Sequence, residues 1–171
     1  MGTYELKVPP ANTNLIGSKW VYKIKRNEKG EIDRYKARLV AQGYRQRYGI
    51  DYEETYAPVV RAATLRWLII LSIKNNWIRK AADATNAYLN GEMTETVYMN
   101  QPPGHQLGAK NEKLLLKKGL YGLKQAGRIW YSTISNYLKE MNYQQSPADP
   151  CIFSKREDLE IVILSVYVDD F

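Results

Sequence analysis

Apolar and basic residues alternate along the segment Lys19-Trp-Val-Tyr-Lys-Ile-Lys-Arg26. A period of two is typical of a strand with one face in water. Asn27-Glu-Lys-Gly30 follows as a turn signal, because Gly30 can adopt a positive φ. Asp33–Ala41 then supplies the returning strand. The pattern predicts a β-hairpin close to the N-terminus.

Two later segments have the spacing of amphipathic helices. Thr64 is suited to cap a helix that ends near Asn75-Asn76. Its predicted apolar face consists of Leu65, Leu68, Ile69, Ser72 and Ile73. Residues 123–141 predict a longer helix. The apolar side of this second helix consists of Ile129, Trp130, Ile134, Tyr137 and Leu138.

The remaining segments predict short strands separated by turns. The strands are expected at Trp77–Asp83, Val97–Asn100, Lys113–Lys117, Cys151–Ser154 and Leu159–Val168, with a turn at Lys155–Asp158 and a short helix or turn at 84–91. Strands and helices mix without a strict βαβ alternation, so the predicted fold class is α+β. With 171 residues and 44 % apolar content, the length suits a single domain.

Two adjacent carboxylates, Asp169-Asp170, follow a strongly β-forming run. Neighbouring carboxylates at the end of a buried strand repel each other and resist desolvation, and a divalent cation resolves both problems. The alternative is a solvated Asp-Asp turn. Asp83 also ends a predicted strand, although it can equally be an N-cap. If the two strand ends meet, three carboxylates converge as two-metal phosphoryl transfer requires.

Composition narrows the choice of chemistry. Residues 1–50 hold eleven of the 25 basic and four of the 18 acidic side chains, so the net charge of +7 lies in the first third of the chain. This segregation favours an anionic partner, with nucleic acid ahead of membrane. The only histidine, His105, argues against a His-ligated zinc or a His base. The only cysteine, Cys151, fits a reducing intracellular compartment, without distinguishing cytoplasm, virus-like particle or nucleus.

Seven blocks, in order, resemble the reverse transcriptase domain of copia-type LTR retrotransposons over residues 2–171. The blocks are Gly17–Arg26, Arg34–Gly43, Asp51–Val59, Asp83–Gly91, Val97–Gly104, Leu120–Ala126 and Tyr167–Asp170. The resemblance implies an RNA-directed DNA polymerase, a nucleotidyltransferase with a right-hand fold. Residues 17–60 would be the fingers hairpin region and residues 61–171 the palm with further fingers residues.

The resemblance also implies the site residues and cofactors. Asp83, Asp169 and Asp170 would be catalytic and would bind two Mg²⁺ ions, or Mn²⁺ in their place. Tyr88 would contact the sugar of the incoming dNTP. Arg38 and Lys25 would clamp the triphosphate, while Tyr121, Gly122 and Gln125 would pack over the nascent base pair and template. Tyr167 and Val168 would lie at the primer end. The partners would be an RNA or DNA template with primer and dNTPs, and no membrane.

The sequence departs from the family pattern at Gly127, where proline is usual, and around Asp83, whose neighbours Ala81, Ala82 and Ala84 are small. The chain ends one residue after the Asp pair, so we expect it to lack the thumb and RNase H domains and expect the run Ile161–Val168 to have an exposed edge. We therefore expect this chain alone to extend a primer weakly or not at all. Two other interpretations are a non-catalytic nucleic-acid-binding remnant and a chain with no stable fold.

Overall fold

The computed structural model describes residues 2–158 and 160–171. The chain forms two compact units, and each is described by itself. One comprises Met1–Thr55 and Glu92–Ala126, and the other comprises Tyr56–Gly91 and Gly127–Phe171. Together they mix strands with helices, which confirms the α+β class. None of the helices in the described residues has the length and apolar character to cross a membrane. The assignment of segments to fingers and palm stays a prediction.

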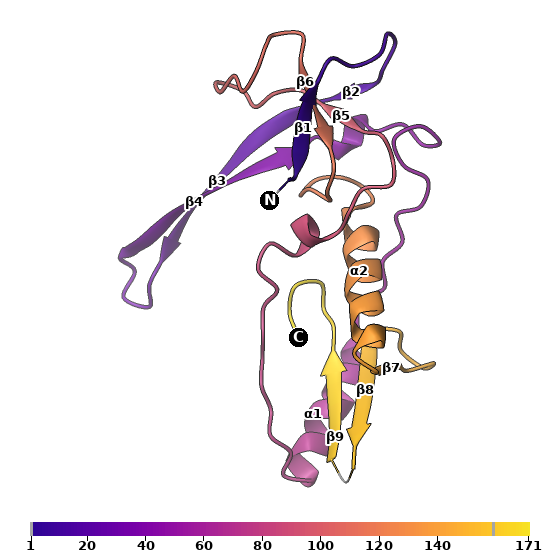
Figure 1. The fold of residues 1–171 in the computed structure, drawn as a ribbon. Helices are drawn as coiled ribbons and strands as arrows, with labels where there is room; N and C mark the ends of the chain where they lie inside the picture. Colours follow the sequence, from indigo (N-terminus) through magenta and orange to yellow (C-terminus); the bar gives the residue numbers. More distant parts are fainter. Residues whose placement is uncertain (1, 159) are drawn as a thin grey trace. The chain divides into compact units, whose positions relative to one another are not determined.

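The first unit contains a small four-stranded sheet (Figure 1). Its strands lie in the order β1 (Tyr4–Lys7), β6 (Lys113–Leu116), β5 (Tyr98–Met99) and β2 (Leu15–Ile16). β5 and β6 confirm the predicted strands, whereas β1 and β2 were not anticipated. Ile16, Met99 and Leu114 are completely buried and form part of the core of this unit.

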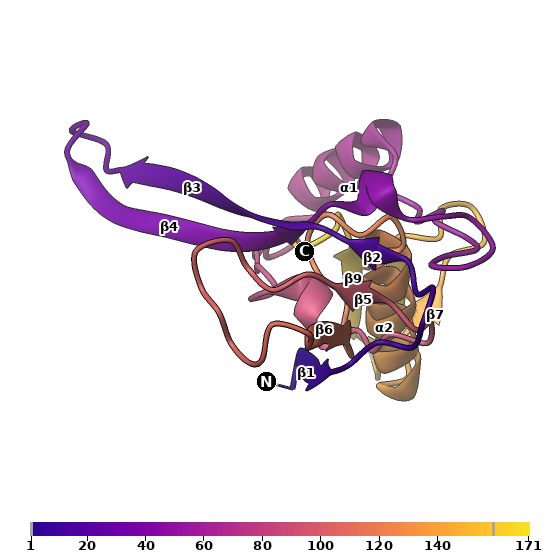
Figure 2. The same cartoon turned by 90° about the horizontal axis from the view of Figure 1, so that it is seen from above.

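The predicted basic hairpin is present as β3 (Ser18–Arg26) and β4 (Ile32–Ala41), which pair in antiparallel register. Gly30 lies in the connecting turn with φ +83°, as the turn signal requires. Figures 1 and 2 show the hairpin as a long twisted two-stranded ribbon, paired only within itself along most of its length. Both faces of its outer part therefore lie in solvent.

The second unit is built on a hairpin of β8 (Ile152–Glu157) and β9 (Glu160–Ser165), extended by the short strand β7 (Gln144–Gln145). Figure 1 shows helix α1 (Ala62–Lys74) behind this hairpin, and the C-terminal part of helix α2 (Ala126–Glu140) beside it. Leu68 of α1 packs on the face that presents Ile152. Leu138 of α2 packs on the opposite face, against Phe153.

Several predicted boundaries were wrong because strand pairing overrides local turn propensity. Lys155–Asp158 is not a turn, since β8 continues to Glu157 and Lys155 pairs with Val162. Residue 159 of the predicted strand 159–168 lies outside the described residues. Trp77–Asp83 is not a regular strand, because only its last residues find a partner. α2 begins at Ala126 and not at residue 123, because two successive turns precede it.

The N-terminus of α1 is capped by a residue distant in sequence. The predicted cap Thr64 lies inside the helix, and Arg61 occupies the N-cap position without a side-chain hydrogen bond. Instead, the Asp149 carboxylate accepts hydrogen bonds from the Arg61 N–H (3.1 Å) and the Cys151 N–H (3.1 Å). Burial disfavours the charged form, but bonds from the Thr64 hydroxyl and these N–H groups outweigh it and lower the pKa of Asp149.

The buried face of α1 also differs from the predicted one. Leu68 packs in the core and Ser72 is buried, whereas Ile69 and Ile73 are 46 % and 60 % exposed. Leu68 and Ser72 are four residues apart and therefore share one helix face. The helix is apolar on more than one side, so hydrophobic periodicity could not select the side that packs.

We expect Asp149 to make the second unit sensitive to acid. Because its pKa is lowered by folding, its stabilisation is complete above the ordinary carboxyl value near 4 and is lost as pH falls through the lower folded value. Asp149→Asn should lower the free energy of unfolding by about 1–3 kcal/mol at pH 7. Below pH 4 the variant should lose less stability than the wild-type chain. Urea unfolding at pH 7 and pH 3 measures both effects. Asp33→Asn, at an exposed hairpin position, is the matched control, and an Asp149→Asn chain with the wild-type acid profile would contradict the assignment.

Candidate active site

The Tyr167–Asp170 segment folds into a tight hairpin turn. The Tyr167 N–H donates to the Asp170 carbonyl (2.8 Å) and the Asp170 N–H donates to the Tyr167 carbonyl (3.0 Å). Val168 and Asp169 are the two central residues, and Val168 has φ +56°. A β-branched residue seldom adopts this left-handed conformation, because its side chain crowds the backbone. The turn is therefore strained at the residue that precedes the carboxylate pair.

Asp83 pairs directly with this turn. The Ala84 N–H donates to the Asp169 carbonyl (2.7 Å), and the Phe171 N–H donates to the Ala82 carbonyl (2.9 Å). Asp83 and Asp170 are bridge partners between these bonds. They form a non-hydrogen-bonded antiparallel pair, in which opposite side chains project from the same face with Cα atoms about 4.5 Å apart. Two backbone segments 87 residues apart thus bring two predicted carboxylates face to face, beside Asp169.

The donor set fits a hard divalent cation, although the side chains do not converge on one point. Asp83 and Asp170 are exposed and Asp169 is half-buried. Among the described residues, no group of three or more His, Cys, Asp or Glu side chains is gathered closely enough to hold a metal ion. Like charges directly opposite across strands are destabilising, and carboxylate oxygens are the ligands that magnesium prefers. The backbone pairing therefore creates a repulsion that a bound cation would remove.

Tyr88 belongs to the same unit as the carboxylates. It lies half-buried in the 3₁₀ helix η2 (Ala87–Asn90), which forms the later part of the predicted segment 84–91 and has Gly91 as its C-cap. Asn86 precedes this helix with φ +54°. Gly91 lies so close to α2 that a Cβ there would overlap the Ile129 side chain. Contact with α2 thus sets the position of the segment that carries Tyr88.

In the first unit, Arg38 and Tyr121 are brought together. The Arg38 guanidinium carbon lies 5.3 Å from the centroid of the Tyr121 ring, within the range of a cation–π contact. The Ala41 N–H donates to the Tyr121 carbonyl (2.8 Å). Gly122 has φ +93°, and a Cβ there would overlap the Ala41 carbonyl oxygen. The Tyr121-Gly122 step is therefore docked onto the end of β4.

Gln125 has a different environment from Tyr121 and Gly122. It is only 1 % exposed, and its amide oxygen accepts a hydrogen bond from the Gln46 amide (2.9 Å). Its amide nitrogen donates to the Asp51 carbonyl (2.8 Å). Both ends of the side chain are thus engaged inside the unit. This placement supports a structural role and gives no support to a side-chain contact with the template.

Lys25 lies on the same face of the β3–β4 hairpin as Arg38. Lys25 pairs with Arg34, which is four residues from Arg38 and therefore about 14 Å away along the strand. The pairing register places six basic residues on this one face, which we call the basic face: Lys19, Lys23, Lys25, Arg34, Lys36 and Arg38. The opposite face presents aromatic and aliphatic residues, including Tyr22 and Tyr35, which are 74 % and 76 % exposed.

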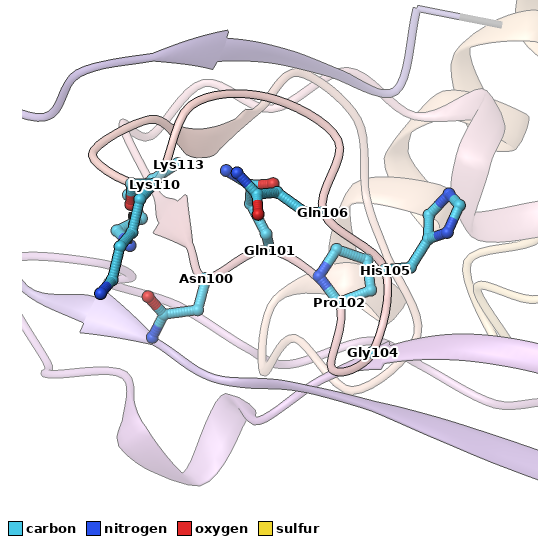
Figure 3. A pocket seen from close by; sticks show the side chains of 8 residues that line it. All are labelled: Asn100, Gln101, Pro102, Gly104, His105, Gln106, Lys110 and Lys113. Carbon is cyan, nitrogen blue, oxygen red and sulfur yellow. Dashed lines mark hydrogen bonds between the residues drawn. The ribbon is translucent and has the colours of Figure 1, made fainter.

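A hollow of about 470 Å³ in the first unit contains none of the predicted site residues. Figure 3 shows the side chains that line it. They are Asn100, Gln101, Pro102, Gly104, His105, Gln106, Lys110 and Lys113. The Gln101 amide shapes this loop by accepting from the Leu107 N–H (2.7 Å) and donating to the Glu112 carbonyl (2.8 Å).

Comparisons with known proteins identify the family of the chain. The profile described as "Reverse transcriptase (RNA-dependent DNA polymerase)" matches residues 1–171. The chain is 41 % identical over 163 residues to the retrovirus-related Pol polyprotein from transposon RE1 of Arabidopsis thaliana, covering 95 % of this chain and 11 % of that protein. It is 37 % identical over 171 residues to the Pol polyprotein from transposon TNT 1-94 of Nicotiana tabacum, covering 99 % and 13 %.

A more distant relative is the transposon Ty1-H Gag-Pol polyprotein of Saccharomyces cerevisiae, 32 % identical over 162 residues, with 91 % of this chain and 8 % of that protein covered. The chain thus spans about a tenth of the length of these relatives. No solved structure matches it. The match over the full length shows that the chain belongs to the reverse transcriptase (RNA-dependent DNA polymerase) family, in the form found in copia-type retrotransposon Pol polyproteins.

Proposed function

We propose that this chain carries the nucleotidyl-transfer centre of an RNA-directed DNA polymerase with a right-hand fold. The observation that carries the proposal is the pairing of Asp83 with Asp170, which sets two carboxylates opposite each other and beside Asp169. Carboxylate oxygens are the ligands that a two-metal site uses, and a bound cation would relieve the repulsion between the opposed pair.

Asp83, Asp169 and Asp170 would hold two Mg²⁺ ions, or Mn²⁺. When bound, the ions supply activation of the primer 3′-hydroxyl and neutralisation of charge on the departing pyrophosphate. The contribution of the chain itself is to keep the carboxylates in place: the hairpin turn presents Asp169 and Asp170, and the paired segment presents Asp83. In such reactions positioning and electrostatic stabilisation account for most of the catalysis.

The remaining predicted residues have roles toward the nucleotide and the primer. The Arg38 guanidinium, stacked on Tyr121, would bind the triphosphate, and Lys25 would contribute charge further along the basic face. Tyr88 would contact the sugar and exclude a 2′-hydroxyl. Tyr167 and Val168 would support the primer end, and Tyr121 and Gly122 the nascent base pair.

Single-nucleotide incorporation tests the proposal. The chain at high concentration is mixed with a primer on an RNA or a DNA template, dNTPs and Mg²⁺ or Mn²⁺. We expect slow incorporation that requires the cation and prefers dNTPs to NTPs. Complete lack of cation-dependent incorporation on both templates would overturn the proposal for this chain.

A second candidate function is nucleic-acid binding without catalysis. The basic face supports it, because six cations in register form a strip of positive charge that suits a phosphate backbone. The two candidate functions respond differently to the loss of Asp169 and Asp170. Catalysis requires these carboxylates, whereas the affinity for nucleic acid through the basic face does not depend on them.

We expect binding to a primer–template duplex to weaken steeply with salt. A plot of the logarithm of the association constant against log [salt] should have a negative slope. Each phosphate contact that Lys23→Ala or Lys25→Ala removes should make this slope less steep by about one. Fluorescence anisotropy at 50–300 mM salt measures the slope. Lys139→Ala, at the end of α2, is the matched control that keeps the wild-type slope. A slope unchanged in the Lys23→Ala, Lys25→Ala double variant would exclude the basic face as the binding surface.

A further inference from the structure

The Tyr167–Asp170 turn has a contact that comes from neither strand. The Trp130 indole N–H donates a hydrogen bond to the carbonyl oxygen of Val168, with 2.6 Å between the heavy atoms. Trp130 is 6 % exposed, so this bond lies in an environment with little competing water. A buried indole N–H needs an acceptor, and here the acceptor is the backbone of the turn itself.

The acceptor residue is the strained one. Val168 has φ +56° and immediately precedes Asp169 in the turn. The two bonds between Tyr167 and Asp170 close the turn, but they leave the Val168 carbonyl unpaired. A turn that reverts to a relaxed conformation at Val168 would rotate this carbonyl and with it the peptide that leads to Asp169. The indole bond opposes that rotation.

Helix α2 gives Trp130 a fixed position. Trp130, Ile134 and Leu138 are spaced four residues apart and form one stripe along the helix. Leu138 and Ile134 pack with Phe153 and Val166 in the core between α2 and the β8–β9 hairpin. Trp130 continues this stripe toward the helix N-terminus. The position of the indole is therefore set by the same core that sets the end of β9.

From these contacts we infer that Trp130 is a positioning residue for the Asp169-Asp170 pair, because its indole N–H holds the Val168 peptide in the strained turn. This inference rests on the proposed nucleotidyl-transfer function. Trp130 touches neither substrate nor cation in this role. Its effect reaches the reaction only through the backbone that carries the carboxylates.

Amide hydrogen exchange tests the bond without requiring activity. Trp130→Phe keeps a ring in the core and removes the donor. We expect exchange at the Asp170 N–H, which closes the turn, to accelerate about tenfold. Exchange at the Val166 N–H, which bonds the Cys151 carbonyl (2.8 Å), should stay unchanged. Trp67→Phe, at a tryptophan that is 64 % exposed, is the matched control.

Kinetics test the consequence for the reaction. In Trp130→Phe the incorporation rate should fall about tenfold, while the KM for dNTP and the Kd for primer–template change less than about twofold. The same substitution is then made in a Val168→Asn chain. Asparagine adopts the left-handed conformation more readily than valine, so there the loss should shrink to about twofold.

The outcomes separate this inference from the proposed function. If the wild-type chain incorporates no nucleotide, the proposed function fails, and the exchange measurement still decides the role of Trp130. Equal acceleration at Asp170 and Val166 would show a general packing role and overturn the inference. Unchanged exchange at Asp170, or an equal loss of rate in the Val168 and Val168→Asn backgrounds, would also overturn it.

Discussion

Asp83→Asn is expected to abolish nucleotide incorporation while making the cation-free fold more stable. Loss of a metal ligand should reduce the rate by about 10³-fold, or about 4 kcal/mol in the barrier. Removal of one of two directly opposed charges should stabilise the paired segments by about 0.2–1 kcal/mol. The rate is measured by single-nucleotide incorporation, and stability by thermal unfolding with and without Mg²⁺.

The opposite signs of the two effects identify a ligand site. A residue with only a structural role would lose rate and stability together. Mg²⁺ should raise the unfolding temperature of the wild-type chain and leave that of Asp83→Asn unchanged. Glu140→Gln, at the C-terminal end of α2, serves as the control with wild-type rate and Mg²⁺ response. An Asp83→Asn chain that is less stable without cation, or that keeps its rate, would refute the assignment.

Gly122→Ala is expected to destabilise the first unit strongly. The left-handed conformation at φ +93° costs alanine about 1 kcal/mol. The added Cβ would also overlap the Ala41 carbonyl oxygen and lie 2.7 Å from Val40 Cγ1, where the surrounding backbone cannot yield cheaply. Together these effects should reduce the free energy of unfolding by about 3–5 kcal/mol, a large part of the total for a small domain. Urea unfolding measures the loss.

Gly104→Ala separates the two causes. Gly104 has φ +74°, but a Cβ at this position would have no other atom within 4 Å. Its substitution therefore carries the conformational cost without the overlap. We expect a loss of about 1 kcal/mol there. Equal losses at the two glycines would show that the docking of Tyr121-Gly122 onto β4 contributes nothing. A larger loss at Gly122, accompanied by weaker dNTP binding, would link this docking to the Arg38–Tyr121 pair.

The basic hairpin was predictable because its information is local. Alternation, a turn with glycine at the required position and a returning strand all lie within residues 19–41. The order of the motif blocks was equally local, and it named the family correctly. Asp83, Asp169 and Asp170 were expected from the same motifs, and their predicted roles remain for experiment to test.

The features that escaped prediction depend on partners far away in sequence. Asp149 caps α1 across 88 residues, so Thr64 was chosen wrongly from its local position. Gln125 lies buried and bonded to Gln46, a contact across 79 residues that its motif did not indicate. Trp130 was expected only as part of an apolar helix side. The one available signal was that a buried indole N–H must find an acceptor.

The sequence by itself determined the hairpin and the order of the motifs, and it singled out three candidate carboxylates, because periodicity, turn chemistry and motifs act over a few residues. Only the tertiary structure decided that Asp83 faces Asp170, that the Tyr167–Asp170 turn is strained at Val168 and that Trp130 donates to it. Such contacts depend on how separate segments pack, and packing rewards complementary shape and satisfied hydrogen bonds that no short stretch of sequence contains.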